Sequence, residues 1–154
     1  MLTKELLADY IDAGAAKKKA DLVIQNGTLI NVNTGEYYPA DVAVYKDKIV
    51  AVDPDVSDYI GEDTKKIDAT GKYLAPGLID CHIHVECSKM GMTRFAQAVV
   101  PRGTTSIITG FDEYISVLGL KGLDDIFAEV DASPLKVFWG IPYKTPYTIP
   151  TSTI

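Results

Sequence analysis

The chain has 154 residues, 47% of them hydrophobic, and a formal net charge of −6 at pH 7. This length and composition suit one domain of ordinary size, or two small ones, with an apolar core. The acidic balance argues against a nucleic-acid partner, because phosphate binding needs clustered basic residues, and no apolar run is long enough to span a bilayer.

Residues 1–20 are expected to form an N-terminal helical segment. Apolar side chains recur at helical spacing within residues 3–19, and Thr3 can cap the first turn. The lysines at positions 17–19 would then lie near the C-terminal end, where the helix dipole favours positive charge. A basic surface patch is the other interpretation of these lysines. Acidic residues among the leucines distinguish the segment from a signal peptide.

Residues 21–72 are predicted to form a small β-domain of short antiparallel strands. Asn26-Gly27 separates two β-rich runs and is a strong hairpin signal. Residues 41–53 are predicted to form a second pair of strands, with residues 46–48 as the expected turn. Residues 65–77 are predicted to add a further strand and a glycine turn. No motif in this part of the sequence indicates a catalytic or binding site.

Residues 73–154 alternate strands with helices, a pattern that predicts βαβ units and a parallel sheet. We expect strands at residues 73–79, 104–109 and 135–141, and helices at residues 93–100 and 123–132. Three parallel strands alone would leave apolar faces and edges uncovered. We therefore expect this chain to be part of a larger fold. Near Phe138 and Trp139 it should meet another chain, either a copy of itself or the remainder of the fold.

The segment APGLIDCHIHVECSKM, residues 75–90, contains the only two histidines of the chain, His82 and His84. Alternate residues of a strand point to one face, so the two histidines would share a face with Asp80 and, if the extended backbone persists, with Glu86. Two imidazoles spaced in this way can reach one metal ion. They would also lie at the C-terminal end of a strand, where (β/α)8 enzymes place their catalytic groups.

These residues also have ordinary explanations. A His-x-His sequence arises by chance, and two histidines alone leave a metal site incomplete. Glu86 taken alone is more often a solvated or helix-capping carboxylate than a ligand. Cys81 and Cys87 are predicted to be packing residues. They lie too close together for the disulfide framework of a secreted protein, which favours a reducing cytoplasm.

Several motifs together resemble those of the amidohydrolase superfamily and, within it, the adenine deaminase family. The motifs are IDATGKYLAPGLIDCHIHVECSKM, VVPRGTTSIIT and VLGLKGLDDIF, and the similarity extends from about residue 20 to residue 146. The resemblance implies an α/β fold: a small antiparallel β-domain followed by the first three βα units of a metal-dependent (β/α)8 barrel, incomplete in this chain. It also implies that residues 73–154 are the barrel portion.

The resemblance further implies a site. His82 and His84 match the pair that binds a divalent metal, manganese, iron or zinc, in a centre of one or two ions. Glu86 matches an acidic residue beside that site, and the remaining family ligands would lie beyond residue 154. Where the family shows Asp-Pro-His-Glu after the second strand, this chain has Gly110-Phe111-Asp112-Glu113. Asp112 or Glu113 could contact the substrate.

The activity implied is hydrolysis of adenine to hypoxanthine and ammonia. The loop after the third strand departs from the family pattern, and its Lys144 could neutralise an anionic group on a different substrate or be a solvated lysine. A cyclic amide hydrolase of the same superfamily is the second interpretation. The third is a catalytically silent fragment, or one half of a split enzyme that needs a partner chain. We expect the 154-residue chain alone to be inactive and to form oligomers.

Overall fold

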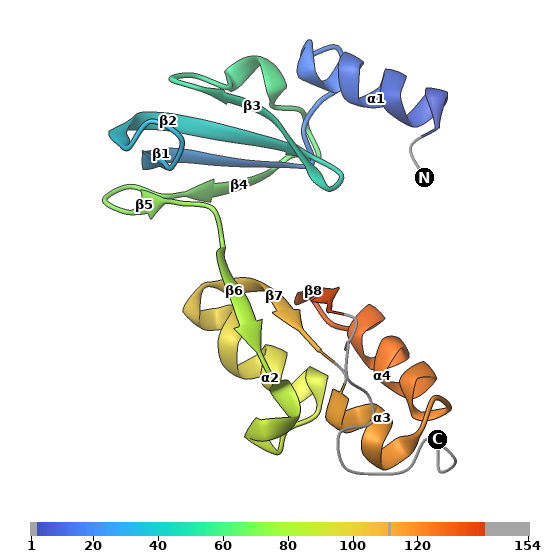
Figure 1. The fold of residues 1–154 in the computed structure, drawn as a ribbon. Helices are drawn as coiled ribbons and strands as arrows, with labels where there is room; N and C mark the ends of the chain where they lie inside the picture. The colour runs from blue at the N-terminus through green and yellow to red at the C-terminus, as the bar shows by residue number, and fades with distance from the viewer. Residues whose placement is uncertain (1–2, 111, 141–154) are drawn as a thin grey trace. The chain divides into compact units, whose positions relative to one another are not determined.

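The computed structural model describes residues 3–110 and 112–140, except for the side chain of Asp112. The chain divides into two compact units, one ending at Pro76 and the other beginning at Gly77 (Figure 1). Among the described residues, no helix is long and apolar enough to cross a membrane.

The first unit begins with helix α1, Lys4–Gly14. The Thr3 hydroxyl accepts a hydrogen bond from the backbone N–H of Leu6 at 3.2 Å, which confirms the predicted cap. The prediction that the helix continues to residue 19 is wrong. The helix ends at Gly14 and is capped by Ala15, whose backbone N–H still bonds to the Ile11 carbonyl, and Ala16 adopts a left-handed backbone with φ of 55°. The lysines at positions 17–19 therefore follow the helix instead of forming its last turn.

A five-stranded sheet makes up the rest of this unit. Its strands are β1 (Leu22–Asn31), β2 (Glu36–Tyr45), β3 (Lys48–Asp53), β4 (Lys65–Asp68) and β5 (Tyr73–Leu74). The order is β3-β2-β1-β4, with β5 also pairing with β1. Pairing among β1, β2 and β3 is antiparallel, whereas β4 and β5 run parallel to β1. The sheet is therefore mixed, and the purely antiparallel prediction holds only for its first three strands.

Asn26-Gly27 is not a hairpin turn. Strand β1 continues through both residues, and the register of its pairing with β2 shifts at this point, which is a β-bulge. Asn26 has a φ of 64°, and its backbone N–H donates to the Asp41 carboxylate at 2.8 Å. A side chain at position 27 would meet Leu74 at 2.6 Å, so glycine is needed for close packing. The hairpin turn lies further along, just before β2, at Gly35 with φ of 75°.

The second predicted turn is confirmed. Residues 46 and 47 connect β2 to β3, and Lys46 has a φ of 53°. One face of the sheet packs against a small core of buried side chains: Ala20, Val23, Ala43 and Val56. Val56 comes from the loop before the short 3₁₀ helix η1, Ser57–Tyr59.

The second unit is a three-stranded parallel sheet in the order β6-β7-β8, with helices between the strands (Figure 1). Its elements are β6 (Leu78–Ile83), η2 (Val85–Ser88), α2 (Met92–Val99), η3 (Val100–Arg102), β7 (Thr104–Thr109), α3 (Asp112–Leu118), α4 (Gly122–Asp131) and β8 (Lys136–Trp139). The strands predicted at residues 104–109 and 135–141 and the two predicted helices are present. Helix α3 and the short helices were not predicted.

The predicted strand over residues 73–79 is wrong. Tyr73 and Leu74 pair with β1 in the first unit, and β6 begins only at Leu78. Pro76 lies between them and has no backbone N–H to offer a sheet. The chain therefore passes between its two units at Pro76 and Gly77, a few residues later than position 73.

The core of the second unit lies around β7 and its flanking helices. Its buried members are Val85, Met92, Phe95, Ala96, Ile107, Ile126 and Leu135. Val85 is fully buried, which fixes η2 directly after β6. On β8, Trp139 packs edge-on against Phe127 with ring centroids 5.4 Å apart, while Phe138 is 47% exposed. The chain is thus an α/β protein with a largely antiparallel sheet and a separate parallel sheet.

Candidate metal and catalytic site

The two histidines lie at the C-terminal end of β6. His82 is in the strand, and His84 follows its last residue. The ring centroids are 5.1 Å apart at an interplanar angle of 77°, so the rings are neighbours, as the alternation predicted. The backbone N–H of His82 donates to Asp80 at 3.1 Å, which ties the carboxylate of Asp80 to this strand end.

Glu86 reaches His84 by a different route from the one expected. The extended backbone does not persist, because residues Val85–Ser88 form the 3₁₀ helix η2. The Ser88 hydroxyl donates to the Val85 carbonyl at 2.6 Å and stabilises this turn. The turn folds the Glu86 carboxylate back toward the imidazole, and Oε1 lies 3.0 Å from Nδ1 of His84.

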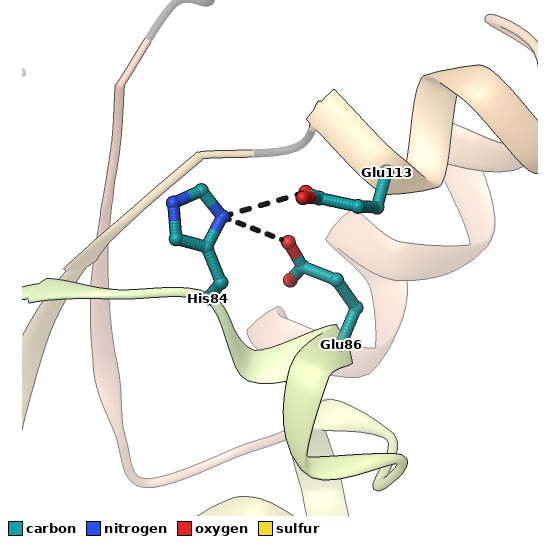
Figure 2. Close-up of side chains that lie close together, drawn as sticks. All are labelled: His84, Glu86 and Glu113. Carbon is teal, nitrogen blue, oxygen red and sulfur yellow. Dashed lines mark hydrogen bonds and ion pairs between the residues drawn. The ribbon is translucent and has the colours of Figure 1, made fainter. Parts of the chain in front are cut away.

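Glu113 completes a cluster of three side chains. It lies in the first turn of α3, which follows the C-terminal end of the neighbouring strand β7. Its Oε2 is 3.4 Å from Nδ1 of His84. Figure 2 shows both carboxylates directed at the same ring nitrogen, while the other ring nitrogen points away from them. One possible ligand atom from each of the three residues lies within 4.8 Å of the others.

The electrostatics of the cluster follow from burial and from neighbouring charges. The hydrogen bond to Glu86 raises the pKa of His84, and the charge of Glu113 adds to this effect. Burial raises the pKa of Glu86, whose side chain is only 11% exposed. The contact with Glu86 lowers the pKa of Glu113. When two carboxylates share a site, the more buried one holds a proton more readily, and the more exposed one stays ionised.

An open pocket of about 340 Å³ lies beside the cluster, between η2 and α3. It is lined by Glu86, Cys87, Glu113, Tyr114, Val117 and Leu118. A volume of this size falls at the lower end of the range for small-molecule sites. Tyr114 is not among the residues predicted from the sequence, where its only signal is its position next to Glu113.

The structure thus brings together His82, His84, Glu86 and Glu113 of the predicted site residues. Asp112 begins α3, but its side chain lies outside the described residues, as does Lys144. Cys81 and Cys87 are both free and exposed, so the prediction that they pack in the interior is wrong.

The carboxylates beside His84 resemble the surroundings of histidines that bind metals. A histidine that binds a metal usually donates its other ring N–H to a carboxylate, which fixes the ring orientation. Nδ1 of His84 faces two carboxylates, and neither of them contacts its Nε2. Histidines and carboxylates at the C-terminal ends of parallel strands lie where (β/α)8 enzymes carry their catalytic groups.

Comparison with curated proteins finds sequence similarity over nearly the whole chain. Adenine deaminase 1 of Latilactobacillus sakei is 66% identical over 146 residues, covering 95% of this chain and 25% of that protein. Adenine deaminase 1 of Desulfotalea psychrophila is 56% identical over 153 residues, covering 99% of this chain and 26% of that protein. The chain spans about a quarter of the length of these relatives. No protein-family model matches it.

Solved structures of amidohydrolases are similar to this chain in fold. A D-aminoacylase described as defining a subset of amidohydrolases is 32% identical with a TM-score of 0.51, covering 59% of this chain and 18% of that one. The N-acyl-D-glutamate deacylase of Bordetella bronchiseptica, solved with zinc and a phosphonate inhibitor, is 26% identical with a TM-score of 0.51. The match covers 60% of this chain and 19% of that one. The chain is therefore similar to solved amidohydrolases in its fold and to adenine deaminases in sequence over nearly its whole length, which confirms the resemblance seen in the motifs.

Proposed function

We propose that this chain is part of a metal-dependent hydrolase that converts adenine to hypoxanthine and ammonia. The observation that carries the proposal is the 66% identity to an adenine deaminase over 95% of the chain. We further propose that the second unit supplies the first three βα units of a (β/α)8 barrel. The remainder of that barrel would pack against β8, where Phe138 is exposed.

The metal would be held by His82 and His84, with manganese, iron or zinc as the candidate ions. The side chains present suit a metal ion, because Nε2 of His84 is directed away from the carboxylates that contact Nδ1 (Figure 2). Imidazole nitrogen is a ligand that these metals accept. When bound, an ion of this kind would lower the pKa of a coordinated water to about 7.

The chain's own side chains have distinct roles in this proposal. Glu86, mostly buried, holds the His84 ring through the 3.0 Å contact at Nδ1. Glu113 is 50% exposed, and its lowered pKa keeps its carboxylate ionised. An ionised carboxylate at the edge of the pocket can accept a hydrogen bond from the amino group or a ring N–H of a purine. Asp112, next to it in the chain, is a second candidate for such a contact.

Hydrolysis of an amide C–N bond, as in a cyclic amide, is the second candidate function. It is favoured by the 32% identity to a D-aminoacylase over 59% of the chain. The same metal and carboxylate residues would serve this reaction, and only the substrate contacts would differ. A cytoplasmic location fits both candidates, because the two cysteines are free and a reducing compartment keeps them so.

Ammonia release from adenine, measured on the complete protein that carries these residues, tests the proposal. We expect turnover that depends on added divalent metal and is abolished by His82→Ala and by His84→Ala, with metal content measured in each variant. Glu86→Gln should lower metal affinity by about 10–100-fold, because it weakens the carboxylate partner of a ligand. Tyr37→Phe, an exposed change in the first unit, is the control.

The 154-residue chain by itself should show no turnover, because two histidines leave most metal positions to water. Hydrolysis of cyclic amides with adenine left intact would favour the second candidate. If the complete protein does neither, it is a silent relative and the proposal is wrong.

A further inference from the structure

Two buried polar atoms near the cluster have no hydrogen-bond partner among the described residues. They are Oε2 of Glu86 and the phenolic oxygen of Tyr114. Both side chains line the pocket between η2 and α3, and the Tyr114 ring also packs on the core of the second unit. Buried polar atoms in folded proteins are nearly always paired, so two orphaned atoms in one place call for a common explanation.

The phenol of Tyr114 is protonated at neutral pH and can donate a hydrogen bond. Burial raises the pKa of Tyr114 to about 12, and the charges of Glu86, Glu129 and Glu113 add to this effect. The group therefore keeps its proton and needs an acceptor. The three carboxylates that act on its pKa are the acceptors to consider.

Only one of these carboxylates has a buried oxygen left over. Glu129 accepts a hydrogen bond from the backbone N–H of Thr93 at 2.9 Å and so holds the start of α2. Glu113 is half exposed and directs Oε2 at His84. Glu86 uses Oε1 for His84 and also contacts Glu113, while its buried Oε2 has no hydrogen-bond partner among the described residues. Among the described residues, Glu86 is thus the acceptor that matches the Tyr114 hydroxyl.

We propose that Tyr114 is a positioning residue that donates a hydrogen bond to Oε2 of Glu86 and thereby holds Oε1 against His84. Any effect of this hydrogen bond on the reaction rests on the proposed function. Tyr114 would affect the substrate site only through Glu86 and His84. It assigns a role to a residue that the motifs did not single out.

A double-mutant cycle in urea unfolding tests the contact without any assumption about the reaction. The variants are Tyr114→Phe, Glu86→Met and the double variant, where Met removes both carboxylate oxygens at similar size. We expect Tyr114→Phe to raise the unfolding equilibrium constant about fivefold or more when Glu86 is present and to have little effect when it is absent. Tyr37→Phe is the control. Equal effects of Tyr114→Phe in both backgrounds would overturn the proposal.

Kinetics of the complete protein test the positioning role itself. If Tyr114 orients Glu86, Tyr114→Phe should lower kcat about fivefold to tenfold and leave KM within about twofold. A coupled cycle with unchanged kcat would show a structural contact only and would overturn the positioning role. If the wild-type protein does not turn over adenine, the proposed function fails on its own. The positioning is then judged by the ¹⁵N shift of His84 Nδ1, which should move in Tyr114→Phe, and an unmoved shift would refute it.

Discussion

The β-bulge in β1 depends on one buried carboxylate, and its removal should be measurable. Asp41 is 8% exposed and accepts hydrogen bonds from the backbone N–H of Asn26 at 2.8 Å and from the side chain of Gln25 at 3.4 Å. Without this acceptor, Asn26 must keep its φ of 64° with no compensating bond. Asp41→Ala should therefore destabilise the protein.

The expected cost follows from the kind of bond that is lost. A hydrogen bond to a charged acceptor contributes about 1.5–3 kcal/mol. Asn26 is itself exposed, so water can partly replace the lost partner, and we expect about 1.5 kcal/mol for Asp41→Ala. Asp41→Asn keeps an acceptor oxygen and should cost less. Asp53, directly across the ladder from Asp41, is exposed, and Asp53→Ala should change stability by less than about 0.5 kcal/mol.

Urea unfolding followed by circular dichroism measures these differences. With an m-value of about 1.5 kcal/mol/M, Asp41→Ala should lower the midpoint by about 1 M relative to wild type. If Asp41→Ala and Asp53→Ala have the same midpoint, then Asp41 does not stabilise the bulge, and the account of why Asn26-Gly27 is a bulge would have to be abandoned.

Two further predictions concern the ion pairs of Asp9 and the core of the second unit. Asp9 pairs with Lys18 and with Lys46, and these partners lower the pKa of Asp9 to about 2. Because the folded-state pKa lies below the unfolded value, this stabilisation is present above about pH 4 and is lost as the pH falls toward 2. Asp9→Asn should therefore flatten the fall of the thermal midpoint in that window, and an unchanged slope would contradict the ion pairs. Ile107 is fully buried in β7, so Ile107→Ala should cost about 2–5 kcal/mol and Ile107→Val about 0.5–1.5 kcal/mol. The two substitutions should be compared by urea unfolding, and equal small costs would mean that this core is not packed as described.

Local signals in the sequence predict the elements of the second unit well. The β-branched run TTSIIT predicts a strand over residues 104–109, and β7 spans Thr104–Thr109. Helices α2 and α4 begin and end within one residue of their predicted bounds. The Thr3 cap is confirmed as well. These features depend on side-chain periodicity and on hydrogen bonds between residues three or four apart, which a short stretch of sequence contains.

The errors occur where distant residues decide the local backbone. Asn-Gly favours positive φ, and that preference serves a turn or a bulge equally well. Pairing with β2 and the Asp41 carboxylate select the bulge at Asn26. In the same way, Tyr73 and Leu74 have a strand-forming sequence, but only their parallel pairing with β1 assigns them to the first sheet instead of to β6.

By itself the sequence determined which residues make up the candidate site, namely the two histidines in alternation at a strand end and the carboxylates nearby, and the family to which these motifs are similar. The tertiary structure decided how the residues meet. The η2 turn, held by buried Val85, brings Glu86 back to His84, and the β7–α3 connection brings Glu113 to the same nitrogen. It also buries Tyr114 and one oxygen of Glu86 together. Ligand types depend on residue chemistry, whereas these contacts depend on how separate elements pack around a shared core, and no local pattern encodes that packing.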